Sequence, residues 1–362
     1  MFYHIFYPLK DFWFGFNIFK YITFRAAFAA ISAFVICVAL GPAVIRLLSR
    51  LNIKEEATRP DAPALREFHG KKSGTPTMGG VLIVGAVIAS TLLWARLDSS
   101  YIWLAVAATS WLCAIGFIDD YMKLANGNGR GMRVMTKFTG QFIAGLAVAL
   151  FLYFSAEATT LLHFPFLKRL VMDLGVFYVP FVIIVIIGAS NAVNLTDGLD
   201  GLAIGCLVMI AAAYALISYV AGHFKISGYL GIPFIPRAAE MSVFCAAILG
   251  SGLGFLWFNS HPASIFMGDT GSLALGGAIG TVAVLIKKEI LLLFVGGVFV
   301  IEALSVILQV ASFKLRGERI FRMAPLHHHF QLKGWPEPKI IVRFWILSAI
   351  LALFALATLK LR

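Results

Sequence analysis

The stretch GVFYVPFVIIVIIGASNAVNLTDGLDG, residues 175–201, decides the fold of this chain. Residues 175–192 are almost entirely apolar, and a helix of roughly 20 apolar residues crosses the hydrocarbon core of a bilayer. Asp197 and Asp200 follow in a short turn, and a second apolar run begins at Leu202. The stretch therefore predicts two membrane crossings joined by a turn that places both acids at one membrane surface.

The composition of the whole chain agrees with this pattern. Hydrophobic residues make up 60% and charged residues 13%, with a mean hydropathy of +0.88, which excludes an ordinary soluble domain. We predict an all-α polytopic membrane protein that forms a single integral membrane domain over residues 1–362, with about ten transmembrane helices. The ten apolar runs are Thr23 to Leu48, Met78 to Trp94, Ile102 to Ile118, Phe138 to Phe154, Gly175 to Ala192, Leu202 to Ala221, Met241 to Phe258, Ser272 to Ile286, Ile290 to Phe313 and Ile340 to Leu359.

The first residues differ from a cleavable signal sequence. An aromatic segment over residues 1–21 precedes the first apolar run, where a signal peptide would carry a basic region. Aromatic side chains favour the headgroup level of a membrane, so we expect this segment to lie in the interface. The four cysteines each fall inside an apolar run without ligand-like spacing, and we interpret them as small core residues.

Lysine and arginine are unequally divided between the two sets of alternate loops. They are more frequent in the set at about 49–77, 119–137, 192–201, 259–271 and 314–339 than in the opposite set. The positive-inside rule places the richer set in the cytoplasm, with both termini in the periplasm. Topology alone explains such a bias, but the net charge of +12 is also concentrated where an anionic substrate would arrive.

Acidic clusters end or begin several apolar runs on this same side. Asp119 and Asp120 close the third run, where two carboxylates at a helix C-terminus are unfavourable unless a cation such as Lys123 or a divalent metal intervenes. Asp269 opens the eighth run, where capping of the helix would also explain it. An even number of crossings separates the clusters, so all of them must face one side, which favours a metal site.

Two further acids and several polar groups surround these clusters. Asp197 and Asp200 are three residues apart and would share a helix face beside Asn194, although N-capping explains one of the acids. The run Lys71-Lys72-Ser73-Gly74-Thr75-Pro76-Thr77 leads into the second apolar run with the glycines and hydroxyls that suit phosphate. Phe266 offers a ring on which a base could stack.

Polar groups near the end of the chain extend this side. His327, His328 and His329 are consecutive, so their side chains diverge and hydrogen bonds to pyrophosphate or sugar hydroxyls are more plausible than zinc ligation. One of them could serve only the loop structure. Glu302 and Gln309 share one face of the ninth run. We expect a buried pairing role for Glu302, and Gln309 could reach the site.

These motifs resemble a known family. The Gly-Thr-Pro-Thr-Met-Gly-Gly run, Asp119-Asp120-Tyr121-Met122-Lys123, the Asn194 to Gly201 segment, Phe266-Met267-Gly268-Asp269 and Pro325-Leu326-His327-His328-His329 resemble the polyprenyl-phosphate N-acetylhexosamine-1-phosphate transferases. The histidines with the following Phe330 to Glu337 segment resemble the phospho-N-acetylmuramoyl-pentapeptide branch. The likeness implies transfer from UDP-N-acetylmuramoyl-pentapeptide to undecaprenyl phosphate, forming lipid I and UMP with Mg²⁺, in a bacterial inner (plasma) membrane.

The resemblance and the chemistry of phosphate transfer together assign site residues. Catalytic roles fall to Asp119, Asp120 and Asp269, with Asp269 and Asp120 as metal ligands. Two polyanions must meet during the reaction, so lysines are needed to neutralise charge. The expected substrate-binding residues are Lys72, Thr77, Lys123, Lys137, Asn194, Asp197, Asp200, Asn259, Phe266, Gly268, Gln309, His327, His328 and His329.

Other functions remain to be compared with this one. A related N-acetylglucosamine-1-phosphate transferase would share the aspartate motifs. A transporter of an anionic lipid or nucleotide would show repeated halves and polar groups near the midplane, and an intramembrane metalloprotease would carry a His-Glu-x-x-His helix; the sequence shows neither pattern. We expect membrane lipids but no nucleic acid among the partners, and a homodimer stays open.

Overall fold

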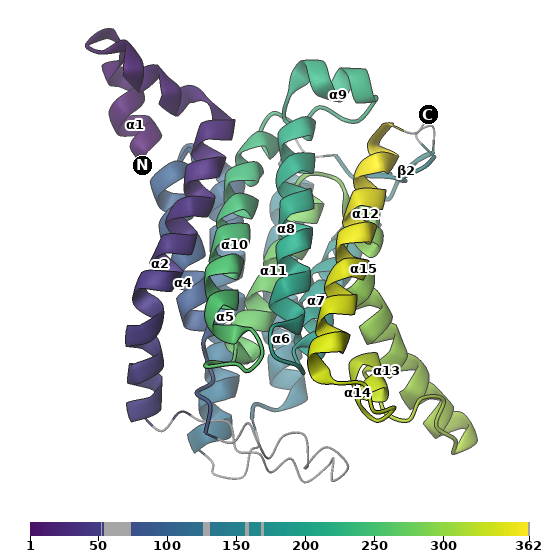
Figure 1. Cartoon of the computed structure of the whole chain (residues 1–362). Coiled ribbons are helices and arrows are strands. Elements are labelled where there is room, and N and C mark those ends of the chain that lie inside the picture. The colour runs from purple at the N-terminus through teal and green to yellow at the C-terminus, as the bar shows by residue number, and fades with distance from the viewer. Residues whose placement is uncertain (52, 54–73, 126–130, 156–158, 168–169, 361–362) are drawn as a thin grey trace.

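A computed structural model of the chain describes residues 1–51, 53, 74–125, 131–155, 159–167 and 170–360. Within these residues, nine helices are long and apolar enough to cross a membrane, and they stand side by side as one bundle (Figure 1). This confirms the prediction of a polytopic helical membrane protein. The nine are α2 (Ile22–Arg50), α5 (Ser100–Ala125), α6 (Val134–Phe154), α7 (Tyr178–Thr196), α8 (Leu202–Ala221), α10 (Ala238–Asn259), α11 (Gly268–Leu285), α13 (Gly297–Arg316) and α15 (Glu337–Ala357).

Two of the ten predicted crossings differ in the structure. The second run forms α4 (Gly80–Trp94), which has 15 residues and is shorter than the other crossings, so the count of ten stays a prediction. The run predicted as one span over Ile290 to Phe313 is divided into α12 (Glu289–Val295) and α13 at Gly296, and α13 is the part long enough to cross. Two adjacent glycines, Gly296 and Gly297, weaken the helix there by roughly 1 kcal/mol each. Hydropathy does not register such a break.

Small elements at one end of the bundle depart from an all-helical chain. Strands β1 (Leu161–His163) and β2 (Val171–Asp173) pair antiparallel, with Leu162 opposite Met172. The short helix α9 (Phe224–Leu230) lies at the same end (Figure 1). Three short helices precede α2 there, namely α1 (Phe2–Phe6), η1 (Tyr7–Asp11) and η2 (Phe14–Lys20). The interfacial location of this first segment stays a prediction.

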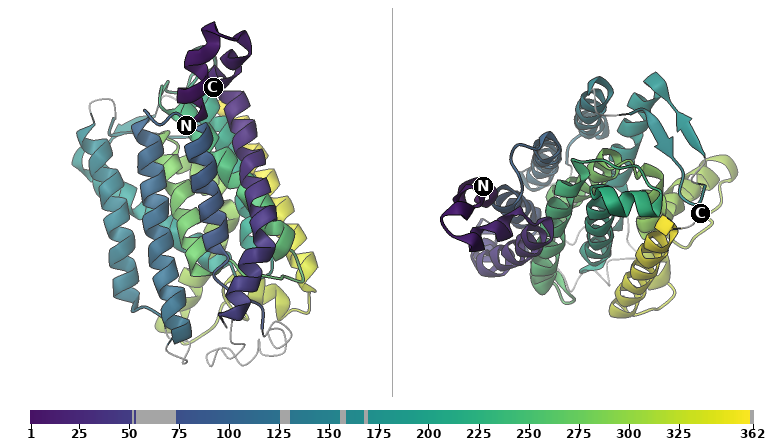
Figure 2. Two further views of the ribbon diagram at one scale, coloured as in Figure 1. Left: turned by 90° about the vertical axis from the view of Figure 1, so that its left-hand side faces the viewer. Right: turned by 90° about the horizontal axis from the view of Figure 1, so that it is seen from above.

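The core lies along the helices at the middle of the bundle. In the apolar window of α11, 89% of the residues are buried, against 22% for α2 and 22% for α13. Figure 2 shows the N-terminal segment and α2 at one edge of the bundle, with the C-terminal helices at the other. Since α11 is the most enclosed helix, any polar group at its first turn is surrounded by other helices.

The predicted site motifs gather at one end of the bundle. Helices α5, α7 and α10 end there, whereas α8, α11 and α15 begin there, opposite the N-terminal segment (Figure 1). Side-chain contacts between α5, α6, α7 and α11 at this end confirm that acids distant in sequence face one side. Its assignment to the cytoplasm stays a prediction.

Candidate active site

The three aspartates at the centre of this end come from two helices in close contact. Asp119 and Asp120 belong to the last turns of α5, and Asp269 belongs to the first turn of α11. A Cβ atom added to Gly116 would lie 2.2 Å from the backbone oxygen of Asp269, so only glycine allows the two backbones to approach this closely. Gly268 has a φ of +71° where the chain turns into α11. Glycines thus bring the acids together.

Two lysines bind these carboxylates. The Nζ of Lys123 lies 2.8 Å from Oδ2 of Asp269, 3.0 Å from Oδ2 of Asp119 and 3.5 Å from Oδ1 of Asp120. The Nζ of Lys137, on α6, lies 2.5 Å from Oδ2 of Asp269 and 3.2 Å from Oδ2 of Asp119. We call these five residues the aspartate–lysine cluster. Three carboxylates and two ammonium groups carry a formal charge of −1.

The aspartates have different local roles. Asp120 accepts hydrogen bonds from the backbone nitrogens of Asp269, at 3.2 Å, and Thr270, at 2.9 Å, and from the Thr270 hydroxyl at 2.7 Å. It therefore satisfies the exposed N–H groups at the start of α11. Asp119 accepts a bond from the Met132 nitrogen through Oδ1, at 2.6 Å. The Oδ2 atoms of Asp119 and Asp269 both face the ammonium groups.

This arrangement fits a hard divalent cation. Three carboxylates already converge on one positive group, Lys123, and carboxylate oxygens are the ligands that Mg²⁺ prefers. Asp269 and Asp119 present their Oδ2 atoms to this position, whereas Asp120 holds the α11 backbone. The contacts thus favour Asp269 and Asp119 as ligands, and ligation by Asp120 stays a prediction.

Asn194 and Thr77 border the cluster. The Nδ2 of Asn194, in the last turn of α7, donates to Oδ1 of Asp269 at 2.7 Å and to the Ser272 hydroxyl at 2.8 Å. It thereby orients the carboxylate that both lysines contact. A Cβ added to Gly268 would lie 3.1 Å from the Thr77 hydroxyl oxygen. Asp197 is the C-cap residue that follows α7, three residues beyond Asn194.

The glycine-rich run before α4 is bound to the segment before α11. The Phe266 nitrogen donates to the Pro76 oxygen at 2.8 Å, and the Gly79 nitrogen donates to the Phe266 oxygen at 2.8 Å. The Gly80 nitrogen continues the pairing at 2.9 Å to the oxygen of Met267. These bonds place the predicted phosphate-binding run beside Asp269. Lys72 lies outside the described residues.

Asn259 makes its contacts with the backbone. Its Oδ1 accepts a bond from the Gly201 nitrogen at 3.0 Å, and its Nδ2 donates to the Ile265 oxygen at 2.7 Å. The side chain is buried and connects the turn between α7 and α8 with the loop after α10. Asp200, in that turn, lies beside His261, a residue that sequence reasoning missed. The roles of Asp200 and Asn259 as substrate contacts stay predictions.

His327 and Gln309 contact protein groups. The Nδ1 of His327 lies 3.2 Å from Oε2 of Glu302, and the His327 nitrogen donates to Oε1 at 3.1 Å, with both side chains fully buried. This confirms the buried pairing role expected for Glu302. The Oε1 of Gln309 accepts from the nitrogens of Ile320 and Phe321. Gln309 therefore holds the loop after α13, and its predicted substrate contact remains untested.

All three histidines lie in the short helix α14 (Leu326–Gln331), and the other two also contact protein groups. The Nδ1 of His328 lies 2.8 Å from Oε1 of Gln331. The Nδ1 of His329 accepts a bond from the Arg322 nitrogen at 3.1 Å. Partial burial, together with the positive charges of Lys333 and Arg322, lowers the pKa of His329. His329 is therefore an acceptor in its neutral form.

The chain is similar in sequence to known proteins over its full length. Residues 102–287 match the family model described as glycosyl transferase family 4, and residues 72–84 match phospho-N-acetylmuramoyl-pentapeptide-transferase signature 1. The chain is 54% identical over 362 residues to a phospho-N-acetylmuramoyl-pentapeptide-transferase of Citrifermentans bemidjiense, covering all of both chains. The same description applies to a protein of Desulfotalea psychrophila, 53% identical over 363 residues with full coverage of both.

Proposed function

Since the chain belongs to the phospho-N-acetylmuramoyl-pentapeptide-transferase family, we propose that it transfers phospho-N-acetylmuramoyl-pentapeptide from UDP-N-acetylmuramoyl-pentapeptide to undecaprenyl phosphate. The products are lipid I and UMP. The observation that carries this proposal is the convergence of three aspartates from α5 and α11 on the Lys123 ammonium group, within 3.5 Å. A reaction between two phosphate-bearing substrates needs positive groups that can move from the carboxylates to the phosphate oxygens.

The reaction requires one phosphorus–oxygen bond to form as another breaks. An oxygen of the lipid phosphate attacks the β-phosphorus of the nucleotide, and the bridging oxygen leaves with UMP. Lys123 and Lys137 can turn from the aspartates toward phosphate oxygens, because their side chains are partly exposed whereas Asp119 is buried. Their charge would offset the repulsion between the two substrates.

The carboxylates position these groups. Asp269 is held by Asn194 and contacts both lysines, so it fixes where positive charge is available. Mg²⁺ held by Asp269 and Asp119 would add charge stabilisation at the phosphate oxygens. A phosphate monoester has a second pKa of about 6, so the lipid substrate needs little help to lose its proton near pH 7. We therefore assign Asp119 to positioning rather than to proton abstraction.

The same proposal includes the location of the protein. Basic loops at the site end support a cytoplasmic active site, and the proposed substrates support a location in a bacterial plasma membrane. The related N-acetylglucosamine-1-phosphate transferases and an anionic lipid or nucleotide transporter are the alternatives that an experiment must separate. A transporter would carry its polar groups near the midplane, whereas the aspartate–lysine cluster lies at helix ends.

The test uses the purified full chain in detergent with undecaprenyl phosphate and Mg²⁺. One reaction receives UDP-N-acetylmuramoyl-pentapeptide and a parallel one receives UDP-N-acetylglucosamine, with UMP and lipid product measured in both. We expect UMP only with the muramoyl substrate, and its loss with chelator. Turnover of the glucosamine nucleotide instead would move the chain to the related branch, and no UMP from either would favour transport.

A further inference from the structure

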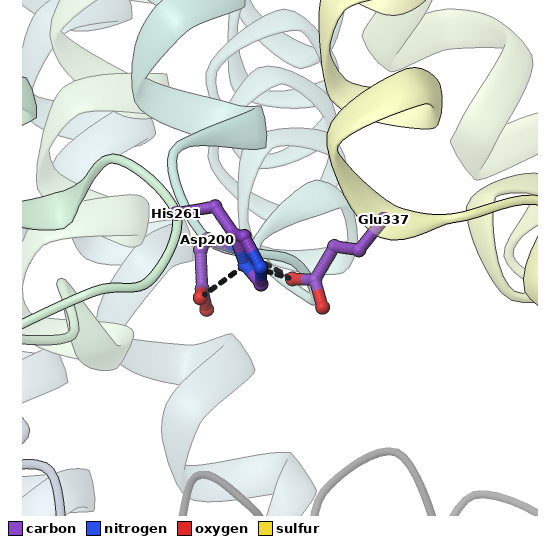
Figure 3. Close-up of side chains that lie close together, drawn as sticks. All are labelled: Asp200, His261 and Glu337. Atoms are coloured by element: carbon purple, nitrogen blue, oxygen red, sulfur yellow. Dashed lines mark hydrogen bonds and ion pairs between the residues drawn. The ribbon is translucent and has the colours of Figure 1, made fainter.

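Three ligand-type side chains meet outside the aspartate–lysine cluster. Asp200 lies in the turn between α7 and α8, His261 in the loop between α10 and α11, and Glu337 at the first residue of α15. The Nδ1 of His261 lies 3.0 Å from Oδ2 of Asp200 and 3.8 Å from Oε1 of Glu337. Figure 3 shows the imidazole between the two carboxylates. We call this group the Asp–His–Glu triad.

The distances within the triad match those of a metal site. One ligand atom from each residue lies within 4.8 Å of the other two. Bonds of about 2.0–2.1 Å in a tetrahedral zinc site separate neighbouring ligand atoms by roughly 3.3 Å. The observed separations of 3.0 and 3.8 Å lie on either side of this value. Shifts of about half an ångström or less would therefore bring each carboxylate oxygen to tetrahedral spacing from the imidazole nitrogen.

Backbone groups orient both carboxylates of the triad. The Ala263 nitrogen donates to Oδ2 of Asp200 at 3.2 Å. The Asp200 nitrogen donates to Oε1 of Glu337 at 3.1 Å. The oxygen atoms nearest to the imidazole are thus held in place by N–H groups, as the carboxylates of metal sites usually are. Asp200 is buried, while His261 is about one-third exposed, which leaves a route for an ion from solvent.

We propose that Asp200, His261 and Glu337 form a binding site for a divalent transition metal of the zinc class. One imidazole nitrogen and two carboxylate oxygens suit Zn²⁺ or Co²⁺, whereas the all-oxygen aspartates suit Mg²⁺. Three protein ligands leave a fourth position for water or an anion. The ion would fasten together the α7–α8 turn, the α10–α11 loop and the start of α15. This inference does not rest on the proposed transferase function.

The experiment measures metal binding directly. The full chain, purified in detergent and stripped with chelator, is titrated with Co²⁺ while its visible absorption is recorded, and Zn²⁺ is then added as a competitor. We expect one saturable Co²⁺ site, displaced by Zn²⁺, in the wild type. His261→Ala should remove the absorption band, and Asp269→Asn should retain it because it alters the aspartate–lysine cluster.

Two further variants separate the site from its surroundings. Glu337→Gln retains an oxygen that can accept the bond from the Asp200 nitrogen, so it should fold normally while weakening Co²⁺ binding at least tenfold. His329→Ala removes another histidine at the same end of the bundle and should leave binding unchanged. The proposal is overturned if the wild type shows no saturable Co²⁺ site, in which case His261 serves only as a hydrogen-bonding link. It is equally overturned if binding survives His261→Ala.

Discussion

At the site end of the bundle, each of two lysines contacts more than one aspartate, whereas at the opposite end Arg25 and Glu240 form a single ion pair. The guanidinium of Arg25 binds Glu240 through two bonds of 2.7 and 2.6 Å, and a third bond of 3.2 Å joins it to the Trp94 oxygen. Glu240 also accepts from the Arg96 nitrogen at 3.0 Å. Both side chains of this pair are almost fully buried.

The difference shows which charged side chains can exchange one ionic partner for another. In the aspartate–lysine cluster, each ammonium group contacts more than one carboxylate, and Lys123 is 37% exposed. If a phosphate group attracted Lys123, Asp119 and Asp269 would still contact Lys137, and Asp120 would keep its hydrogen bonds to the start of α11. Arg25 has no such freedom, because moving it would strand Glu240 in a low-dielectric environment. The first arrangement suits chemistry and the second suits stability.

The largest expected effect comes from Asp269→Asn. The amide can keep the bond to Asn194 but loses the charge that holds Lys123 and Lys137. We expect UMP release to fall about 1,000-fold, the upper range for loss of one preorganised electrostatic group. The melting temperature should change little. The matched control is Asp98→Asn, which breaks an exposed pair with Arg96 at the opposite end and should leave turnover unchanged.

The Arg25→Met variant should show the reverse behaviour. Removing one partner of a buried pair leaves Glu240 uncompensated, which costs about 3 kcal/mol of unfolding free energy. Activity per folded molecule should stay within twofold of wild type, because Arg25 lies at the other end of the bundle. Thermal unfolding in detergent measures the first effect and UMP release the second. A second substitution, Glu240→Gln, should recover part of the stability; failure to do so would contradict the pairing argument.

The bundle itself could be predicted because its signals are local. Long apolar runs defined the crossings, and counting them placed Asp119, Asp197 and Asp269 on one side. Hydropathy could not predict the break at Gly296, because the residues on both sides of it are apolar. Direction changes in a membrane helix depend on packing against neighbours, which one sequence does not reveal. The pair of glycines was the available signal.

The Asp119→Asn variant tests positioning at the site end. Asp119 contacts both lysines and the Met132 backbone, so its loss should misplace charge and reduce turnover on the order of 100-fold. Because the lipid phosphate is already mostly ionised, raising the pH from 7 to 9 should not restore the rate. Rates of wild type and variant are compared across this range at constant Mg²⁺. Recovery to the wild-type rate at high pH would instead establish Asp119 as a general base.

The contacts between site residues were harder to predict than which residues belong to the site. Asn194 and Lys137 were expected near the acids, but nothing in the spacing indicated that Asn194 binds Asp269 itself. Glu302 was expected to pair without an identified partner, and the structure supplies His327, 25 residues away in sequence. His261 and Glu337 were not expected at the site, because a single polar residue in a loop or at the start of a helix carries no periodicity. Such contacts arise only when separate helices are packed together.

The smallest effect concerns Lys287, a buried lysine in the turn between α11 and α12, at the end of the bundle opposite the site. Its ammonium group donates a hydrogen bond to the Thr159 oxygen. Burial lowers the pKa of Lys287 from 10.5 to about 8, although Glu289 partly offsets this. Between these values the unfolded chain binds more protons than the folded one, so stability rises with pH. Below about pH 8 Lys287 is charged in both the folded and the unfolded state, and the folded state bears the full free-energy cost of burying that charge. We therefore expect the melting temperature of wild type to rise by a few degrees relative to Lys287→Met between pH 8 and 10. Parallel melting curves for the two proteins would mean that the ammonium group, which lies 3.7 Å from the centre of the Tyr178 ring, is stabilised in place like the paired charges of Arg25 and Glu240.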